Sequence, residues 1–345
     1  MPLLLYFYLN DKIIKTNNPL KSILISTNHG GTMSKHKFFI VDAFTEKTFG
    51  GNAAGVVILE DNEDFPSEEE MIKLAAELRY SETVFIKPYL SDNECDFHAR
   101  YFTPTDEVDL CGHATIGGIY CLSKASDLKN CSIRLKTKAG IINVEVNGND
   151  VLMDMAAPVH IATFEEGDIL ARIYETMGIA VPEKSSVASL KPMAISTGLP
   201  DIMLPIPSKK VLDSMEPKMD LISELSKDLG VVGIHAFATK YDGELSAERK
   251  VFCRNFAPLY GIDEEAATGT SNGALAYYFY INNMLTTDGV LNVIQGESME
   301  CPSSITAKLS RLSDGAGLNK SKFKNDIKIR VGGSAAILAS GLVNL

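Results

Sequence analysis

The chain has 345 residues, 45% of them hydrophobic and 22% charged, which is the composition of a folded protein. Its length fits two domains of about 150 residues each better than one core. The formal net charge is -11 and no block of basic residues occurs, which argues against nucleic acid as the main partner. No apolar run approaches the roughly 18 residues of a membrane span, so we expect no membrane partner either.

The six cysteines show neither a C-x-x-C pair nor the histidine spacing of a zinc site. Free thiols are the rule in a reducing compartment, so we expect a cytoplasmic protein without a metal.

Residues 1–33 differ from the rest of the chain, because they are rich in asparagine and show no hydrophobic periodicity. We treat them as an N-terminal extension. A Gly-Gly pair shortly before Met33 has the form of a translated ribosome-binding site, which gives the hypothesis that Met33 is the native start.

The next segment alternates strands with one helix. Residues 38–44 predict a strand, and the glycine-rich turn at 49–51 leads into a second strand that ends near residue 59. Ser67 and Glu70 have the spacing of a capping box, and an amphipathic helix follows to residue 78. Glu82 then stands directly before an apolar strand at residues 83–86, where a carboxylate is costly unless it is exposed, paired or functional.

A strand at 98–103 precedes a helix at 112–123 whose apolar residues spread around its whole circumference. A helix of that kind is enclosed by other elements, here by strands. Further strands are predicted at 132–136, 141–146 and 151–155. The sequence M-A-A-P at 155–158 breaks this pattern, so we place domains at 34–158 and 159–345, with the last strand free to cross back to the first domain.

The second half repeats this mixture of elements. Helices are predicted near residues 169–177 and 221–229. Residues 196–206 form a glycine turn followed by an apolar run, as at Gly51. Strands are predicted at 233–239, 250–256, 290–295, 304–309, 328–331 and 335–338. Many short strands around one apolar helix, twice over, make the fold class α+β.

One motif occurs twice. Arg100, Phe102 and Pro104 correspond to Arg254, Phe256 and Pro258, each pair 154 positions apart. The same shift pairs Val108 and Asp109 with Ile262 and Asp263, and after a three-residue insertion Gly112 corresponds to Gly269.

Each copy ends with a glycine and small hydroxylated residues at the start of a helix. Exposed amide groups at a helix start bind carboxylate or phosphate with help from the helix dipole. Two similar halves therefore predict a cleft with anion-binding amides on both walls. The alternative is that these residues only cap two buried helices.

Several ordered motifs from about Lys37 to Leu345 resemble the phenazine biosynthesis-like (PhzF) family, whose members have the diaminopimelate epimerase-like fold. The motifs are V-D-A-F, G-G-N-A-A-G-V-V, Y-S-E-T-V-F-I, F-T-P-T-D-E-V-D-L-C-G-H-A-T-I-G, G-I-D-E-E-A-A-T-G-T-S-N-G-A and R-V-G-G-S-A-A-I-L-A-S-G.

This resemblance implies two similar domains, each a barrel-like mixed β-sheet wrapped around a central helix. It also implies a homodimer and a cofactor-free isomerase that moves a proton on a small carboxylic acid in the cleft. Carried over, Glu82 is the acid/base and His113 and Glu265 assist it as catalytic residues. The implied substrate-binding residues are Cys111, Gly112, Gly269, Thr270 and Ser271.

The second copy departs from the family pattern E-D-P-A-T-G-S. Glu265 stands for Asp, Ala266 for Pro and Thr270 for Ser. A second family pattern, Q-G-x-x-M-G-R-P-S, reads Q-G-E-S-M-E-C-P-S from Gln295, so that Glu300 and Cys301 replace a Gly-Arg pair. The lost arginine removes a possible carboxylate clamp, and the sequence does not identify the substrate.

Moving a proton between carbons requires a group that takes it and returns it in a partly enclosed site, which a carboxyl group can do. We therefore predict that Glu82 shuttles the proton while the amides of Gly112, Gly269 and Thr270 stabilise the developing charge.

Two alternatives stay open. One is a two-thiol racemase, in which Cys111 takes the first thiol's place, although Thr268 stands where the second thiol is needed. The other is a binding protein without catalytic activity.

Overall fold

The computed structural model describes residues 6–9, 12–15, 35–61, 63–89, 94–182, 190–241, 244–245, 250–311 and 327–345. None of the helices in these ranges is long and apolar enough to span a membrane. Most of the predicted extension, including Met33, lies outside them. Within it, β1 (Tyr6–Leu9) and β2 (Lys12–Lys15) pair as antiparallel strands. The aromatic and β-branched residues in both runs favour strands, although runs this short show no hydrophobic period.

The chain forms two compact units. The first contains Met1–Val41, Ala53–Val151 and Ile337–Leu345, and the second contains Asp42–Asn52 and Leu152–Ala336. A division at residue 158 alone would leave residues 42–52 in the first domain. They belong to the second unit because two backbone hydrogen bonds hold them there. The amide of Gly51 donates to the carbonyl of Pro302 (3.1 Å), and the amide of Ser304 donates to the carbonyl of Phe44 (2.7 Å).

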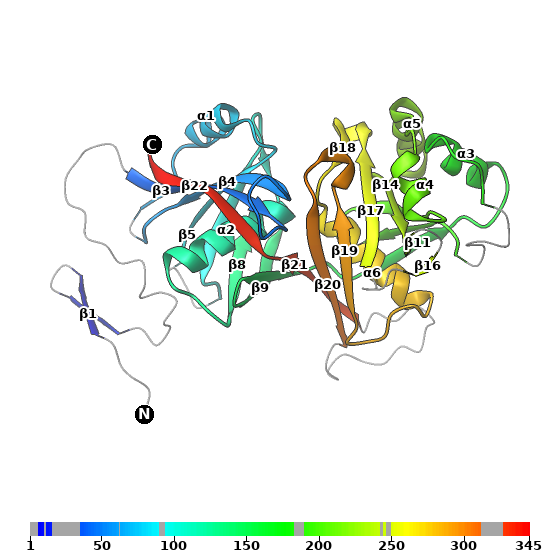
Figure 1. The fold of residues 1–345 in the computed structure, drawn as a ribbon. Helices are drawn as coiled ribbons and strands as arrows, with labels where there is room; N and C mark the ends of the chain where they lie inside the picture. Colours follow the sequence, from blue (N-terminus) through cyan, green and yellow to red (C-terminus); the bar gives the residue numbers. More distant parts are fainter. Residues whose placement is uncertain are drawn as a thin grey trace. The chain divides into compact units, whose positions relative to one another are not determined.

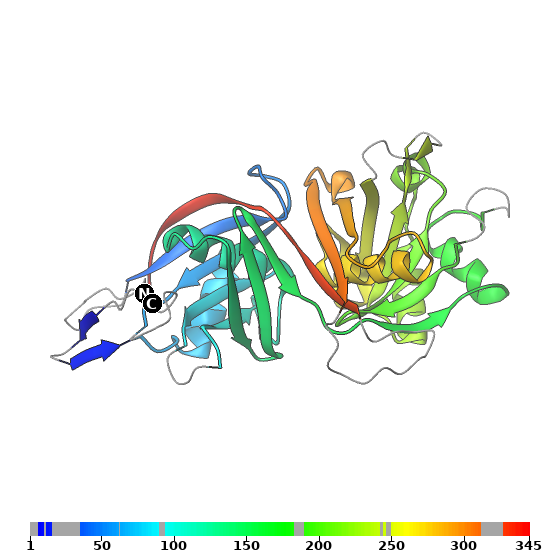
Figure 2. The same cartoon turned by 90° about the horizontal axis from the view of Figure 1, so that it is seen from below.

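The sheet of the first unit joins β22, β3, β4, β5, β6, β8 and β9 in that order, with β7 beside β6 and β10 beside β9. β4 and β5 are parallel, whereas β5 and β6 are antiparallel. Figure 2 shows β22 (red) beside β3 (blue). The strands are β3 (Lys35–Ala43), β4 (Asn52–Ile58), β5 (Thr83–Pro88), β6 (Phe97–Phe102), β7 (Glu107–Val108), β8 (Cys131–Thr137), β9 (Gly140–Asn147), β10 (Asp150–Asp154) and β22 (Ala335–Asn344).

The apolar helix α2 (Gly112–Ala125) lies among these strands, as its sequence predicts (Figure 1). Two glycines allow the close approach. A Cβ atom at Gly117 would lie 2.6 Å from Cγ1 of Val41 in β3, and one at Gly118 would lie 2.7 Å from Cδ1 of Ile86 in β5.

The helix α1 (Glu68–Leu78) covers an outer cluster of the first unit. Its predicted capping box is confirmed, because Ser67 Oγ accepts from the amide of Glu70 (3.3 Å) and Glu70 accepts from the amide of Ser67 (2.9 Å). The buried residues beneath it are Val57, Leu59, Met71, Ala75, Phe85 and Phe102, with Val343 and Leu345 of the C-terminal segment packed against them.

The sheet of the second unit joins β11, β12, β13, β14, β17, β19, β20 and β21, with β18 beside β17. The strands are β11 (Val159–Thr163), β12 (Met193–Ser196), β13 (Pro200–Pro205), β14 (Gly233–Ala238), β17 (Lys250–Ala257), β18 (Ile262–Glu265), β19 (Val290–Gln295), β20 (Ser303–Arg311) and β21 (Ile327–Gly333). A separate pair consists of β15 (Lys240–Tyr241) and β16 (Glu244–Leu245).

The central helix of this unit, α6 (Gly269–Ile281), packs against β12, β13, β20 and β21. Three helices lie on the other face of the sheet (Figure 1). They are α3 (Asp168–Thr176), α4 (Lys209–Ser214) and α5 (Met219–Leu229). Their buried residues contribute to one apolar cluster of this unit. Each unit thus has a mixed sheet around one helix, which is the fold class that the sequence predicts.

The duplication is visible in equivalent contacts. In the first unit, Arg100 pairs with Glu107 through two hydrogen bonds of 2.8 and 2.9 Å and lies 5.1 Å from the ring centre of Phe102. In the second, Arg254 pairs with Glu264 at 2.9 and 2.8 Å and lies 5.0 Å from the ring centre of Phe256.

These contacts correct the predicted alignment of the two copies. Tyr101 faces Val108 in the ladder of β6 and β7, and Asn255 faces Glu265 in that of β17 and β18. The three-residue insertion therefore precedes the acidic residue, in the turn that contains the short helix η2 (Pro258–Tyr260). Val108 corresponds to Glu265, and pairing it with Ile262 was wrong by three positions.

Candidate functional site

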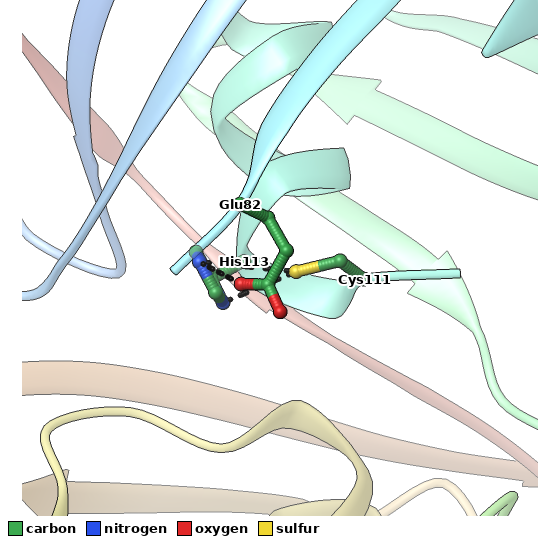
Figure 3. A group of neighbouring side chains, drawn as sticks. All are labelled: Glu82, Cys111 and His113. Carbon is green, nitrogen blue, oxygen red and sulfur yellow. Dashed lines mark hydrogen bonds and ion pairs between the residues drawn. The ribbon is translucent and has the colours of Figure 1, made fainter. Parts of the chain in front are cut away.

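Three side chains with acid/base or nucleophilic groups meet in the first unit. Nε2 of His113 lies 3.2 Å from Oε2 of Glu82, and Sγ of Cys111 lies 3.3 Å from Nδ1 of His113 (Figure 3). Glu82 directly precedes β5, whereas Cys111 is the N-cap of α2 and His113 its second residue. The parallel pairing of β4 with β5 fixes this position, because the carbonyl of Glu82 accepts from the amide of Gly55 (3.3 Å).

The three groups differ in their access to solvent. The side chain of His113 is 6% exposed and that of Glu82 is 20% exposed, so the carboxylate is more accessible to a small molecule than the ring. Burial lowers the pKa of His113, and the nearby Glu82 opposes that shift only in part. The imidazole is therefore neutral at neutral pH. Ser81 Oγ lies 3.3 Å from its Nε2 and provides a further polar contact.

The start of α2 is suited to an anion. Its N-cap, Cys111, has an extended backbone and makes no side-chain capping hydrogen bond. The first amides of a helix have no acceptor within the helix, and the helix dipole adds positive potential there. Gly112 is thus in a position to bind a carboxylate next to Glu82.

The predicted residues of the second motif lie at the start of α6. The N-cap here is Thr268, again without a side-chain capping hydrogen bond, and Gly269 and Thr270 form the first turn. Thr270 is half-buried, and its carbonyl accepts from Thr197 Oγ1 (2.8 Å).

The carboxylate of Glu265 is held within the second unit by two side chains. Asn52 Nδ2 donates to one oxygen (3.2 Å) and Thr268 Oγ1 donates to the other (2.9 Å). Gln295 Nε2 donates to the carbonyl of Glu265 (2.7 Å) and to Thr268 Oγ1 (3.1 Å). Sequence reasoning missed Asn52 and Gln295, although each lies in a quoted motif, G-G-N and Q-G.

The side chain of Ser271 is enclosed by its own unit. It is fully buried, and its hydroxyl donates to Asp201 in β13 while accepting from Asn255 Nδ2 (3.2 Å). The role of Ser271 in substrate binding stays a prediction. Thr270 and Ser271 are neighbours on a helix, and they face different surroundings because adjacent side chains point about 100° apart.

The structure thus groups Glu82, Cys111, Gly112 and His113 in the first unit, and Glu265, Gly269 and Thr270 at the start of α6 in the second. The prediction that both groups line one cleft stays a prediction. The glutamate has no counterpart in the second unit. Thr83 faces Phe102 and Ile234 faces Phe256, so Glu82 corresponds to Gly233.

The segment that departs from the family pattern also has a defined conformation. Glu300 has φ of 58°, in the left-handed region where the family has glycine, and Cys301 is a half-buried free thiol. Glycine adopts this conformation without steric cost, whereas glutamate does not.

Comparison with known proteins agrees with the fold and the motifs. Residues 41–341 match the family described as phenazine biosynthesis-like protein. An uncharacterized isomerase of Clostridium acetobutylicum is 33% identical over 273 residues, which cover 77% of this chain and 87% of the relative. The uncharacterized isomerase YddE of Escherichia coli K12 is 32% identical over 269 residues, covering 76% of this chain and 85% of YddE.

Among solved structures, a phenazine biosynthesis protein of the PhzF family from Bacillus anthracis superposes with a TM-score of 0.73 at 27% identity. The superposition covers 91% of this chain and 100% of the Bacillus anthracis chain. The fold and the two motif-bearing helix starts define an isomerase with an epimerase-like architecture. The chain belongs to the phenazine biosynthesis-like (PhzF) family.

Proposed function

We propose that this isomerase needs no cofactor and moves a proton between two positions of a small carboxylic acid, with Glu82 as the acid/base. The observation that carries the proposal is the pairing of a partly exposed Glu82 carboxylate with a buried His113 ring 3.2 Å away, next to the uncapped start of α2.

The proposed reaction has two steps. The substrate carboxylate binds at the amide of Gly112, and Glu82 removes a proton from a carbon next to an unsaturated or carbonyl group. Negative charge then spreads over the substrate, where helix-start amides and His113 stabilise it by hydrogen bonding. Glu82 returns the proton at a second carbon, so the composition of the substrate does not change. We propose that Glu265, with the amides of Gly269 and Thr270, contacts the same substrate.

The arrangement at α6 argues against the two-thiol alternative. Thr268 is the N-cap residue equivalent to Cys111, and its hydroxyl donates to Glu265. A threonine hydroxyl is too weak an acid to replace a thiol in proton transfer.

Solvent exchange tests the proposal without a known substrate. The purified protein in deuterium oxide is mixed with small aromatic and amino carboxylic acids, and NMR follows the loss of carbon-bound protons. We expect at least one acid to exchange with the wild type, and Glu82→Gln to slow that exchange by about 100-fold or more. Glu77→Gln serves as the matched control, because Glu77 is exposed on α1 and lies outside the site.

A folded Glu82→Gln protein with the wild-type exchange rate would exclude Glu82 as the acid/base. If an acid instead raises the thermal midpoint of both proteins and exchanges with neither, the binding-protein alternative is correct.

A further inference from the structure

The group that contains Glu82, Cys111 and His113 also has the donor set of a metal site. Each side chain offers one ligand atom, an oxygen, a sulfur and a nitrogen, and these atoms lie within 4.8 Å of one another. We infer that these three side chains form a binding site for a thiophilic divalent cation, Zn²⁺ above all, with one coordination position left open.

The separations between donor atoms support this inference. Bonds of about 2.0–2.1 Å to nitrogen or oxygen and about 2.3 Å to sulfur place neighbouring tetrahedral donors roughly 3.3–3.6 Å apart. In the structure, Oε2 of Glu82 is 3.2 Å from Nε2 of His113, and Sγ of Cys111 is 3.8 Å from that nitrogen and 3.3 Å from Nδ1. The third separation, between Sγ of Cys111 and the Glu82 carboxylate, is at most 4.8 Å, so side-chain rotations would bring all three atoms to bonding distance.

A second observation concerns the carboxylate itself. Oε2 of Glu82 is buried, and although it lies close to His113 it has no partner in hydrogen-bonding alignment. A buried carboxylate oxygen without a hydrogen bond is costly, and a bound cation would compensate it.

The donor types select the metal. A thiolate and an imidazole favour Zn²⁺, Co²⁺ and similar ions, whereas Mg²⁺ and Ca²⁺ prefer oxygen donors throughout. Three protein ligands leave the fourth position of a tetrahedral zinc ion to water or to another small ligand. The sequence hid this set, because C-x-H is not a usual zinc spacing and Glu82 lies far from it along the chain.

A bound zinc ion would occupy the atoms that the proposed reaction uses. Its coordination would hold the Glu82 carboxylate and the His113 nitrogen, so neither could exchange a proton with a substrate. Zinc is therefore an inhibitor of the isomerase. This consequence depends on the proposed function, whereas the binding of the metal does not.

Metal titration of the full-length, reduced and chelator-treated protein tests the site directly. With Co²⁺ as the probe, we expect the visible bands of tetrahedral cobalt and a near-ultraviolet sulfur-to-cobalt band, both displaced by one equivalent of Zn²⁺. Cys111→Ser should abolish the sulfur band and weaken Zn²⁺ binding in calorimetry by about 10-fold or more. Loss of a residue that only hydrogen-bonds a metal ligand already lowers metal affinity by about 10-fold, so loss of a ligand itself should cost at least as much. Glu82→Gln should weaken Zn²⁺ binding but keep the sulfur band.

Cys131→Ser and Cys301→Ser are the matched controls, because both residues are half-buried free thiols elsewhere in the chain. We expect both to bind cobalt like the wild type. Circular dichroism and thermal unfolding without metal show whether each variant is folded. A sulfur band that survives in folded Cys111→Ser, or that disappears in either control, would refute the site.

The solvent exchange assay then separates the two proposals. Exchange that stops when one equivalent of Zn²⁺ binds supports both. If Zn²⁺ binds at Cys111 and exchange continues, the metal site stands and the catalytic role of Glu82 is wrong. If no acid exchanges even in metal-free protein, the proposed function fails and the cobalt spectra alone decide the metal site.

Discussion

At the scale of single residues, one buried titratable group of the second unit is Asp201. It is 3% exposed, in β13, and accepts a hydrogen bond from Ser271 of α6. Burial raises the pKa of Asp201 to about 6, although hydrogen bonds from Ser271, the Gly233 amide and Asn255 oppose the shift. This carboxyl group links the central helix of the second unit to the sheet around it.

The raised pKa makes stability depend on pH. The folded-state pKa of about 6 lies above the ordinary value of 3.8. The stability contribution of protonated Asp201 is therefore complete below about pH 4 and is lost as pH rises through 6. Relative to Asp201→Asn, the free energy of unfolding of the wild type should fall by about 3 kcal/mol in total from below pH 4 to well above pH 6.

Urea unfolding at several pH values between 4 and 7 measures this difference. Asp150→Asn, at an exposed position, is the control and should follow the wild type throughout. A constant difference between wild type and Asp201→Asn across the range would show that Asp201 does not titrate there.

At the scale of elements, each unit depends on how closely its sheet approaches the central helix. In the first unit this approach relies on Gly117, which faces Val41 of β3. The start of α6 in the second unit is different, because a Cβ atom at Gly269 would have no heavy atom within 4 Å.

Alanine at these two positions should therefore have opposite effects. Gly117→Ala forces Val41 or the helix to move, and such overpacking lowers the free energy of unfolding by about 1–3 kcal/mol. Gly269→Ala places a methyl group in open space at a helical position. The free energy of unfolding should therefore stay unchanged or rise by up to about 1 kcal/mol. Chemical denaturation of both variants is the measurement. Equal losses of stability in the two variants would mean that the packing of α2 against β3 does not restrict the size of the side chain at position 117.

At the scale of the whole molecule, neither unit is continuous in sequence. Ile337–Leu345 joins the first unit although about two hundred residues of the second precede it. Val343 and Leu345 pack against the cluster beneath α1. This segment therefore completes the apolar core on which α1 lies.

Deletion of residues 342–345 should destabilise the first unit. Loss of two partly buried apolar side chains costs about 1–2 kcal/mol, or roughly 2–6 °C in the thermal midpoint of a domain of this size. Hydrogen exchange should rise in α1 and β5 and stay unchanged in α3 and α5, which cover the second unit. Faster exchange in α3 and α5, without a change in α1 and β5, would show that the segment stabilises the second unit and not the first.

Much of the local structure follows from the sequence because its causes are local. The start of α1 depends on two residues three positions apart, Ser67 and Glu70. The enclosure of α2 follows from apolar residues on all its sides. The strands β11 and β12 and the helix α4 were not predicted. Each has only four to six residues, too few to show a period.

The site was predictable only as a set of residue types. That Glu82 stands at the mouth of an apolar strand is visible in the sequence. That Asn52 holds Glu265 is not, because the two residues are 213 positions apart and meet through the return of residues 42–52 to the second unit. The burial of Ser271 is hidden in the sequence for a similar reason, since only the packing of α6 against β13 shows which way its side chain faces.

The sequence alone determined that the chain is a duplicated α+β protein with an acidic residue before one strand and a glycine at a helix start in each half. These features depend on hydrogen bonds, hydrophobic periods and motif spacing within a few residues. The tertiary structure decided which side chains meet at Glu82, where the insertion between the two copies lies, and how the units share their segments. Such contacts join residues far apart in the chain, and their geometry is set by packing that no local pattern encodes.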